Sequence, residues 1–412
     1  MNPSPQRDFR ILLCAVGVSA VGSRVTRTAL PMAAILLLGA TPLQLGWLSV
    51  LGVLPGALVA WWAGAWIDRR SRRAVMIGAD WARALLIASI PAAALWGTLS
   101  LAQLGLVAAL ACMATVLFEI ADHAYLPSIV PAGRLVEANS RLETVDALAE
   151  ISGPALGGAL VQWLTAPFAL AIDAASFVVS ALVIGRIRAV EPSREADAIR
   201  HASGSSLLRE ARGGLALVWR HPLLRALFVS TMLLTFFMSF MAPLYTLFAL
   251  ETLKMSPGVL GMVIGCGGIG ALAGAAATPA LVSRFGSGRV TMTALIAGGA
   301  SQVFIPLAPA DPVTGTAFLV ASQLLGDGLL TIYVITETSL RQQAVAAEAL
   351  GRTAAVWKTA ASVLAPFGML LGALLAEAAG IRTALWVLVG GGISAAIPLA
   401  AARRAFTMPR LQ

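Results

Sequence analysis

The chain has 412 residues, of which 58% are hydrophobic and only 12% are charged. Soluble domains carry about 25% charged residues, so this composition excludes an ordinary water-soluble fold and indicates a chain embedded in a membrane. The net charge of +9 does not indicate nucleic-acid binding, because the cationic residues lie in alternate loops between apolar stretches.

A helix that spans a bilayer needs roughly 20 apolar residues, and twelve such stretches follow one another along the chain. We predict them near 10–38, 42–66, 74–97, 101–122, 138–163, 167–187, 222–250, 257–282, 290–308, 313–337, 352–377 and 381–402. The predicted fold class is an all-α polytopic membrane protein with two six-helix bundles, at 1–187 and 221–412, joined by a cytoplasmic loop at 188–220.

The loop charges predict the orientation of the chain. Most of the 29 Lys and Arg residues fall in the loops that share one side of the membrane with both termini. Positively charged loops stay in the cytoplasm. We therefore expect a multi-pass protein of the bacterial inner membrane with both termini in the cytoplasm.

The link between the second and third stretches reads GAWIDRRSRR. It resembles the G-x-x-x-D-R-x-G-R-R signature of major facilitator transporters at Gly64, Asp68, Arg69, Arg72 and Arg73, with Ser71 in place of the usual second glycine. A carboxylate among guanidinium groups accepts charge-assisted hydrogen bonds or caps the positive end of a neighbouring helix. These residues are a candidate conformational latch, and the alternative is a solvated loop that only sets topology.

Two acids at the end of the fourth stretch, Glu119 and Asp122, are predicted partners of the latch arginines.

The fifth stretch contains SGPALGG. Gly153, Pro154, Gly157 and Gly158 resemble the end of the G-P-x-x-G-G pattern typical of antiporters in the same superfamily. Proline kinks a helix, and glycines let a neighbouring helix approach closely. The resemblance implies export rather than import, and the alternative is ordinary small-residue packing.

Four further segments narrow the resemblance. FRILLCAVGVSAVGSRVTRTALP, RAVMIGADWARAL, YLPSIVPAGRLVEANS and AIDAASFVVSAL look like the macrolide-efflux and enterobactin-exporter-like branch of bacterial facilitators. This branch implies a secondary active exporter of small organic compounds, of drug, macrolide or siderophore type, that works by alternating access with proton antiport. The fourth stretch lacks the arginine that many multidrug–proton antiporters carry, so the resemblance does not imply coupling by that route.

Ionisable residues inside apolar stretches are expensive and mark functional or paired positions. Arg24 and Arg27 lie near the middle of the first stretch. The sequence leaves three roles open for them: they bind an anionic group, they pair with a carboxylate on a neighbouring helix, or they form a purely structural pair. Glu143, Asp146 and Glu150 follow a spacing of i, i+3 and i+7, which places them on one helical face. This face is our candidate proton or cation site.

Asp327 in the tenth stretch is a second candidate for the coupling site, whereas Asp173 in the sixth is expected to be structural. Asp146 and Lys358 occupy matching positions before the prolines of the fifth and eleventh stretches, and we predict that they form a gate when the cytoplasmic side closes. The alternative is that Lys358 pairs with the nearby Glu337.

The sequence contains no nucleotide-binding loop, zinc signature or nucleophile motif, so we expect no enzyme activity, cofactor or metal. The expected partners are a small-molecule substrate, protons and the lipid bilayer, with no nucleic acid, and the chain is expected to be a monomer. The competing functions are an importer or facilitator of a small metabolite, and a membrane sensor or scaffold that transports nothing.

Overall fold

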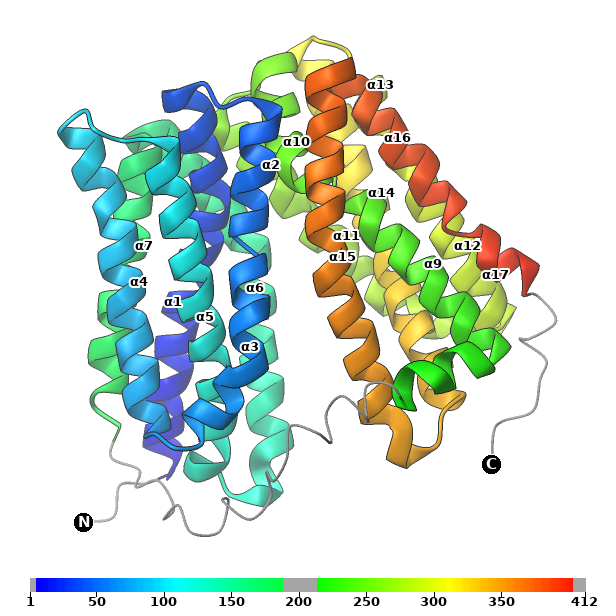
Figure 1. Ribbon diagram of the computed structural model, residues 1–412, viewed down its shortest axis with the longest axis horizontal. Coiled ribbons are helices and arrows are strands. Elements are labelled where there is room, and N and C mark those ends of the chain that lie inside the picture. Colours follow the sequence, from blue (N-terminus) through cyan, green and yellow to red (C-terminus); the bar gives the residue numbers. More distant parts are fainter. Residues whose placement is uncertain (1–4, 188–212, 403–412) are drawn as a thin grey trace. The chain divides into compact units, whose positions relative to one another are not determined.

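The computed structural model describes residues 5–187 and 213–402, and all regular structure within these ranges is helical (Figure 1). The first half contains α1 (Pro5–Leu38), α2 (Pro42–Leu51), α3 (Leu54–Ile67), α4 (Arg72–Leu95), α5 (Leu101–Ile129), the short 3-10 helix η1 (Ala132–Arg134), α6 (Leu135–Leu164) and α7 (Ala166–Ile184). The all-α polytopic fold predicted from hydropathy is confirmed.

The second half repeats this arrangement with more breaks. It contains α9 (Pro222–Met238), α10 (Met241–Leu247), the π-helical turn η2 (Phe248–Thr252), α11 (Pro257–Phe285), α12 (Ser287–Ser301), α13 (Phe304–Leu307), α14 (Pro312–Gln343), the 3-10 helix η3 (Ala347–Ala349), α15 (Leu350–Ala379), α16 (Ile381–Ser394) and α17 (Ile397–Ala401). Each predicted apolar stretch coincides with one helical element or with two or three consecutive ones.

Local sequence explains where the helices begin. Thr41 and Gln44 form a capping box at the start of α2, and the Asp311 carboxylate accepts a hydrogen bond from the Thr314 backbone at the start of α14. Such caps satisfy backbone N–H groups that have no partner within the helix. Proline stands at the first position of α2, α9 and α14, where its missing N–H costs nothing.

Eleven helical segments of the described chain are long and apolar enough to cross a membrane. The fifth predicted span, α6, is not among them although it has 30 residues. The first half of α6 carries Glu137, Arg141, Glu143 and Asp146, and its second half contains Glu150 together with the less apolar segment SGPALGG. A spanning helix with so many ionisable groups requires partners or water along its path.

The chain divides into two compact units, Met1–Ala202 with Ser256–Gly265, and Ser203–Met255 with Cys266–Gln412. In the first unit α1 packs against α6 and α7, and α4 packs against α5 and α7. In the second unit α12 packs against α14 and α16, and α9 against α15. Most of the predicted linker at 188–220 lies outside the described residues, so the predicted domain boundaries stay a prediction.

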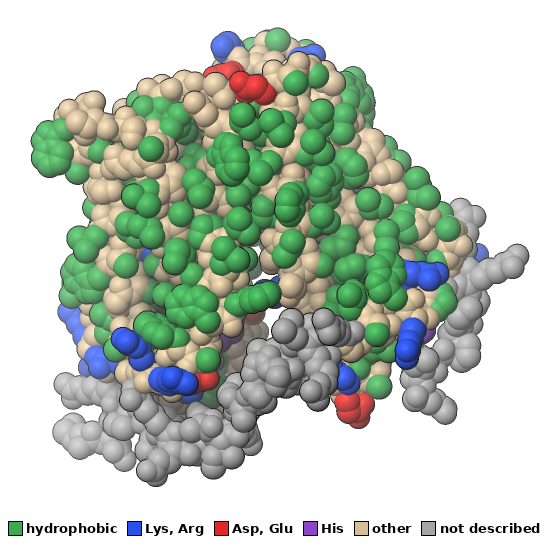
Figure 2. Space-filling model, in the orientation of Figure 1, with side chains coloured by type: hydrophobic (Ala, Val, Ile, Leu, Met, Phe, Trp, Pro, Cys, Tyr) green, Lys and Arg blue, Asp and Glu red, His purple; other side chains and the backbone are tan. Residues whose placement is uncertain are grey.

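Each unit has a core of its own. Met76 and Tyr125 are fully buried in the first unit, and Tyr333 and Trp357 are buried in the second. The outward-facing helix surfaces are apolar, as Figure 2 shows for one face of the molecule. Apolar side chains on the outside of a helical bundle are suited to contact with lipid.

Candidate functional site

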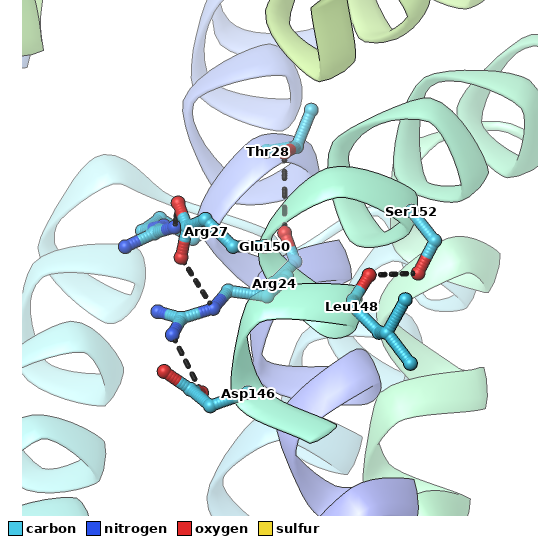
Figure 3. Close-up of polar contacts among 7 residues, drawn as sticks. All are labelled: Arg24, Arg27, Thr28, Asp146, Leu148, Glu150 and Ser152. Atoms are coloured by element: carbon cyan, nitrogen blue, oxygen red, sulfur yellow. Dashed lines mark hydrogen bonds and ion pairs between the residues drawn. The ribbon is translucent and has the colours of Figure 1, made fainter. Parts of the chain in front are cut away.

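The charged residues of α1 and α6 meet in one ion-pair network. Nη2 of Arg24 lies 2.8 Å from Oδ1 of Asp146, and Nε of Arg24 lies 2.8 Å from Oε2 of Glu150. Nη2 of Arg27 binds the other oxygen of Glu150 (Figure 3). Of the sequence alternatives for Arg24 and Arg27, the structure therefore shows pairing with carboxylates on a neighbouring helix.

Helical spacing produces this network. Arg24 and Arg27 lie about one turn apart on α1, and Asp146 and Glu150 lie about one turn apart on α6, so the two pairs form a ladder between packed helices. Glu143 continues the acidic face and is exposed, with no ion pair among the residues that the structure describes. Together the two facing helix surfaces carry three acidic side chains and two basic ones.

The exposure of these groups gives information about their surroundings. The side chains of Asp146 and Glu150 are 54% and 47% exposed, whereas Arg24 is only 21% exposed. Half-exposed carboxylates at this depth of a spanning helix are incompatible with direct contact with lipid tails. The network therefore requires water or a polar ligand beside it.

Glycines set the distance between α6 and its neighbours. A Cβ at Gly153 would clash with the Arg24 side chain, and a Cβ at Gly157 would lie 3.2 Å from the Val25 Cα. On another side of α6, a Cβ at Gly158 would lie 2.8 Å from the Cα of Gly261 at the start of α11, which belongs to the same compact unit. Gly153, Pro154, Gly157 and Gly158 thus lie where α6 makes its closest backbone contacts.

The predicted latch residues lie at the α3–α4 link. Asp68 is exposed and ends α3. Nη1 of Arg72 donates to the Ala124 carbonyl at 3.0 Å, and Nε of Arg73 donates to the Ile184 carbonyl at 3.2 Å. These arginines therefore hold backbone carbonyls near the ends of α5 and α7.

The remaining latch residues differ in their surroundings. Gly64 is part of α3, where a Cβ would meet nothing within 4 Å, and Arg69 is exposed just after that helix. Glu119 is exposed on α5, whereas Asp122 is buried one turn further along. The pairing of these two acids with the latch arginines stays a prediction.

The candidates of the second unit are placed separately. Asp327 lies on α14 beside α11, because a Cβ at Gly267 would clash with its carboxylate. Lys358 is exposed on α15, and the structure shows no Lys358–Glu337 ion pair among the described residues. Glu337 is instead buried, at 4% exposure. Since Asp146 and Lys358 belong to different units, the predicted gate stays a prediction.

The structure reveals a buried charge pair that the sequence analysis did not select. Asp80 and Arg83 of α4 form an ion pair at 0% and 3% side-chain exposure. The Arg83 guanidinium lies 4.5 Å and 4.3 Å from the ring centroids of Phe118 and Phe177. The signal available in the sequence was an acid and an arginine three positions apart inside an apolar stretch.

A second buried acid lies close to this pair. Asp173 of α7 is fully buried and accepts hydrogen bonds from the hydroxyls of Thr26 and Ser176, the latter at 3.0 Å. Thr26 lies between the two arginines of the α1 network in sequence, so this turn of α1 contacts polar groups on both α6 and α7.

Comparison with known proteins assigns the family. The model of the Major Facilitator Superfamily matches residues 12–347. The chain belongs to this superfamily. The fold, the repeated halves and the signature at the α3–α4 link agree with that assignment.

Several relatives of this major facilitator protein are named as efflux proteins. It is 28% identical over 390 residues to the "Multidrug efflux pump Tap" of Mycolicibacterium fortuitum, an alignment that covers 93% of this chain and 92% of the relative. It is 23% identical over 391 residues to "Macrolide efflux protein A" of Streptococcus pyogenes, with 93% of each chain covered. The efflux-type branch indicated by the sequence motifs is confirmed.

Solved structures agree in fold. The nucleoside transporter NupG superposes with a TM-score of 0.79 at 15% identity, covering 99% of this chain and 100% of that one. A bacterial homologue of the iron transporter ferroportin, in an inward-facing state, gives a TM-score of 0.73 at 19% identity, covering 97% and 99%. At these identities the similarity establishes the fold alone.

Proposed function

We propose that this major facilitator protein exports small organic compounds across the bacterial inner membrane by alternating access, with protons moving inward. The observation that carries the proposal is the half-exposed network of Arg24, Arg27, Asp146 and Glu150. Ionisable groups that are part-hydrated inside a spanning bundle mark substrate or ion pathways. The two efflux relatives support the outward direction.

The charge balance of the network favours a cationic or neutral amphiphile as substrate. Arg24 is held by two carboxylates and Arg27 by one, so neither guanidinium is presented alone to an anion. Glu143 adds a third acid to the same helical face. The sequence left an anionic substrate open, and the pairing of both arginines weighs against it.

The same pairs offer a means of proton coupling. A proton taken up by Glu150 would remove its charge and release Arg27 and one side of Arg24. Arg27 would then lose its ion pair with α6, and Arg24 would be held there by Asp146 alone, which weakens the contact of α6 with α1 beside the glycines. Proton binding and a shift of α1 against α6 would therefore be linked.

The test of export is the susceptibility of an efflux-deficient bacterial host to a panel of cationic, neutral and anionic compounds, with and without this protein. We expect reduced susceptibility and reduced accumulation for cationic amphiphiles. Increased accumulation would instead indicate an importer, and unchanged accumulation of compounds that bind the purified protein would indicate a sensor or scaffold.

The test of the network uses Glu150→Gln with Glu348→Gln as the matched control. Glu348 is an exposed acid on η3 of the second unit, remote in sequence from the network. We expect loss of pH-driven export in the first variant and none in the second, at equal expression. If Glu150→Gln, Asp146→Asn, Glu143→Gln and the triple variant all export with unchanged pH dependence, the coupling site lies elsewhere, with Asp327 the next position to neutralise.

A further inference from the structure

A groove follows one face of α1 at the end where the helix begins. Its volume is about 340 Å³, and its lining residues are Gln6, Arg7, Arg10, Ile11, Cys14 and Val183. The α1 members recur at intervals of three or four residues, so they form a single stripe along the helix. Val183 contributes from the last turn of α7. The groove therefore runs along the junction of α1 and α7.

The polarity of this stripe changes with depth. Arg7 and Arg10 stand nearest the start of α1, and Ile11 and Cys14 follow along that helix toward the middle of the bundle. At 1.5 Å per residue, Arg7 and Cys14 are separated by about 10 Å along the axis. Cationic groups followed within that distance by apolar ones match the order of phosphate and acyl chain in a phospholipid.

A smaller cavity adjoins the groove and adds further positive charge. Its volume is about 180 Å³, and it shares Gln6 and Arg10 with the groove. Arg134, Arg141 and Glu137 also line the cavity. Nη2 of Arg134 lies 3.1 Å from one oxygen of the Glu137 carboxylate, and Nη2 of Arg141 lies 2.7 Å from the other. One carboxylate cannot neutralise this set of arginines. Positive side chains do gather at this end of the first unit on the face in Figure 2.

The two arginines of the groove lack an acidic partner. Among the residues that the structure describes, neither Arg7 nor Arg10 forms a salt bridge. The first turn of α1 also contains an acid, Asp8, but its side chain is buried and does not line the groove. Guanidinium groups bind phosphate oxygens through paired, charge-assisted hydrogen bonds. The site therefore has the charge and the donors that a phosphate needs.

We propose that the groove and the adjoining cavity bind an anionic phospholipid. Its phosphate lies between Arg7 and Arg10, and one acyl chain follows Ile11, Cys14 and Val183. The glycerol part of the headgroup extends toward the arginines of the cavity. A soluble anion would not use the apolar half of the groove, where Cys14 is exposed. By the predicted orientation, this lipid belongs to the cytoplasmic leaflet.

This lipid holds two segments of the first unit together. The groove belongs to α1 and α7, whereas the cavity is also lined by the ends of α5 and α6. A headgroup that contacts both sets would tie the start of α1 to the start of α6, the same two helices that form the ion-pair network. The proposal concerns lipid binding, and it stands or fails independently of export.

Cys14 supplies a probe inside the groove. In a background without Cys112 and Cys266, a small bimane label on Cys14 is reconstituted into phosphatidylcholine vesicles. A low fraction of the lipid is then replaced by brominated phosphatidylglycerol or, in parallel, by brominated phosphatidylcholine. We expect stronger quenching by the anionic lipid at equal bromine content. Equal quenching by both lipids overturns the proposal.

The role of the arginines is tested with the double variant Arg7→Gln/Arg10→Gln. The control is a second double variant, Arg284→Gln/Arg289→Gln, at the α11–α12 link. One cationic residue near an anionic membrane surface contributes on the order of a fivefold gain in affinity. The double variant is therefore expected to lose roughly 25-fold of the preference for phosphatidylglycerol, each single variant about fivefold, and the control none. A double variant that keeps the preference refutes the site.

Two further measurements guard against artefacts of the label. Native mass spectrometry of the unlabelled protein should show more retained phosphatidylglycerol in the wild type than in the Arg7→Gln/Arg10→Gln variant. Glycerol phosphate, which has the charge but no acyl chain, should not displace the brominated lipid at equal concentration. Displacement at equal concentration would assign the site to a soluble anion and would disprove the lipid proposal.

Discussion

The close contact between α6 and the start of α11 makes a quantitative prediction at Gly158. In Gly158→Ala the new Cβ would clash with the Pro257 carbonyl and lie 2.8 Å from the Cα of Gly261. Both neighbours are backbone atoms, so no flexible side chain can move aside. The helices must separate, and α6 cannot do so freely because it also packs closely against α1.

The expected cost follows from a matched control. Gly78 lies on α4, where an added Cβ meets nothing within 4 Å. Both substitutions gain the same helix propensity, about 1 kcal/mol for alanine over glycine. Inserting a methyl group into a tightly packed site costs about 1–3 kcal/mol. The free energies of unfolding of Gly158→Ala and Gly78→Ala should therefore differ by about 2 kcal/mol, with Gly78→Ala the more stable.

The assay is thermal unfolding of both purified variants and the wild type in one detergent. A change of 1 kcal/mol shifts the melting temperature by roughly 2–4 °C in a domain of 150–250 residues. Gly158→Ala should therefore melt roughly 4–8 °C below Gly78→Ala. If the two variants melt at the same temperature, the α6–α11 contact is looser than the structure shows and the argument from Gly158 is wrong.

Three other predictions concern charge. Asp68→Asn should insert at wild-type level but slow export, because the latch loses its anion; normal export at equal expression, measured by accumulation, would count against a latch. Cysteines at Asp146 and Lys358, in a background free of native cysteines, should cross-link with a short reagent only when the outward-facing state is trapped, and failure in every trapped state would rule out the gate. The hydrogen bond from the Thr314 backbone N–H lowers the pKa of Asp311. The ionised cap therefore stabilises α14 fully when the pH is above the ordinary pKa of aspartate, and this contribution is lost as the pH falls through the lowered pKa. Asp311→Asn keeps a capping side chain and should lose only that pH dependence, which thermal unfolding across acidic pH measures; an unchanged pH profile would contradict the assignment.

Most of the fold could be predicted from the sequence because it depends on local properties. Apolar length decides which segments span a bilayer, and prolines such as Pro42 and Pro312 mark where helices begin. Loop charge predicts the side of the membrane without any tertiary information. The break at 52–53, which divides one predicted span into α2 and α3, was not predicted, although Gly52 ends α2 and Pro55 stands in the first turn of α3.

The site was only partly predictable, because helical spacing gives the face on which a residue lies but not the helix that it meets. The sequence placed Asp146 and Glu150 on one face of α6 and left the partner of Arg24 open; only the packing of α1 against α6 decided that all three pair. For Arg83 the sequence shows an acid, Asp80, three positions away on the same helix, but only the packing of α5 and α7 against α4 places the rings of Phe118 and Phe177 beside its guanidinium. Helix-to-helix contacts depend on the close approach that glycines and small residues allow over the whole bundle, and that is a property of the folded chain rather than of any one segment.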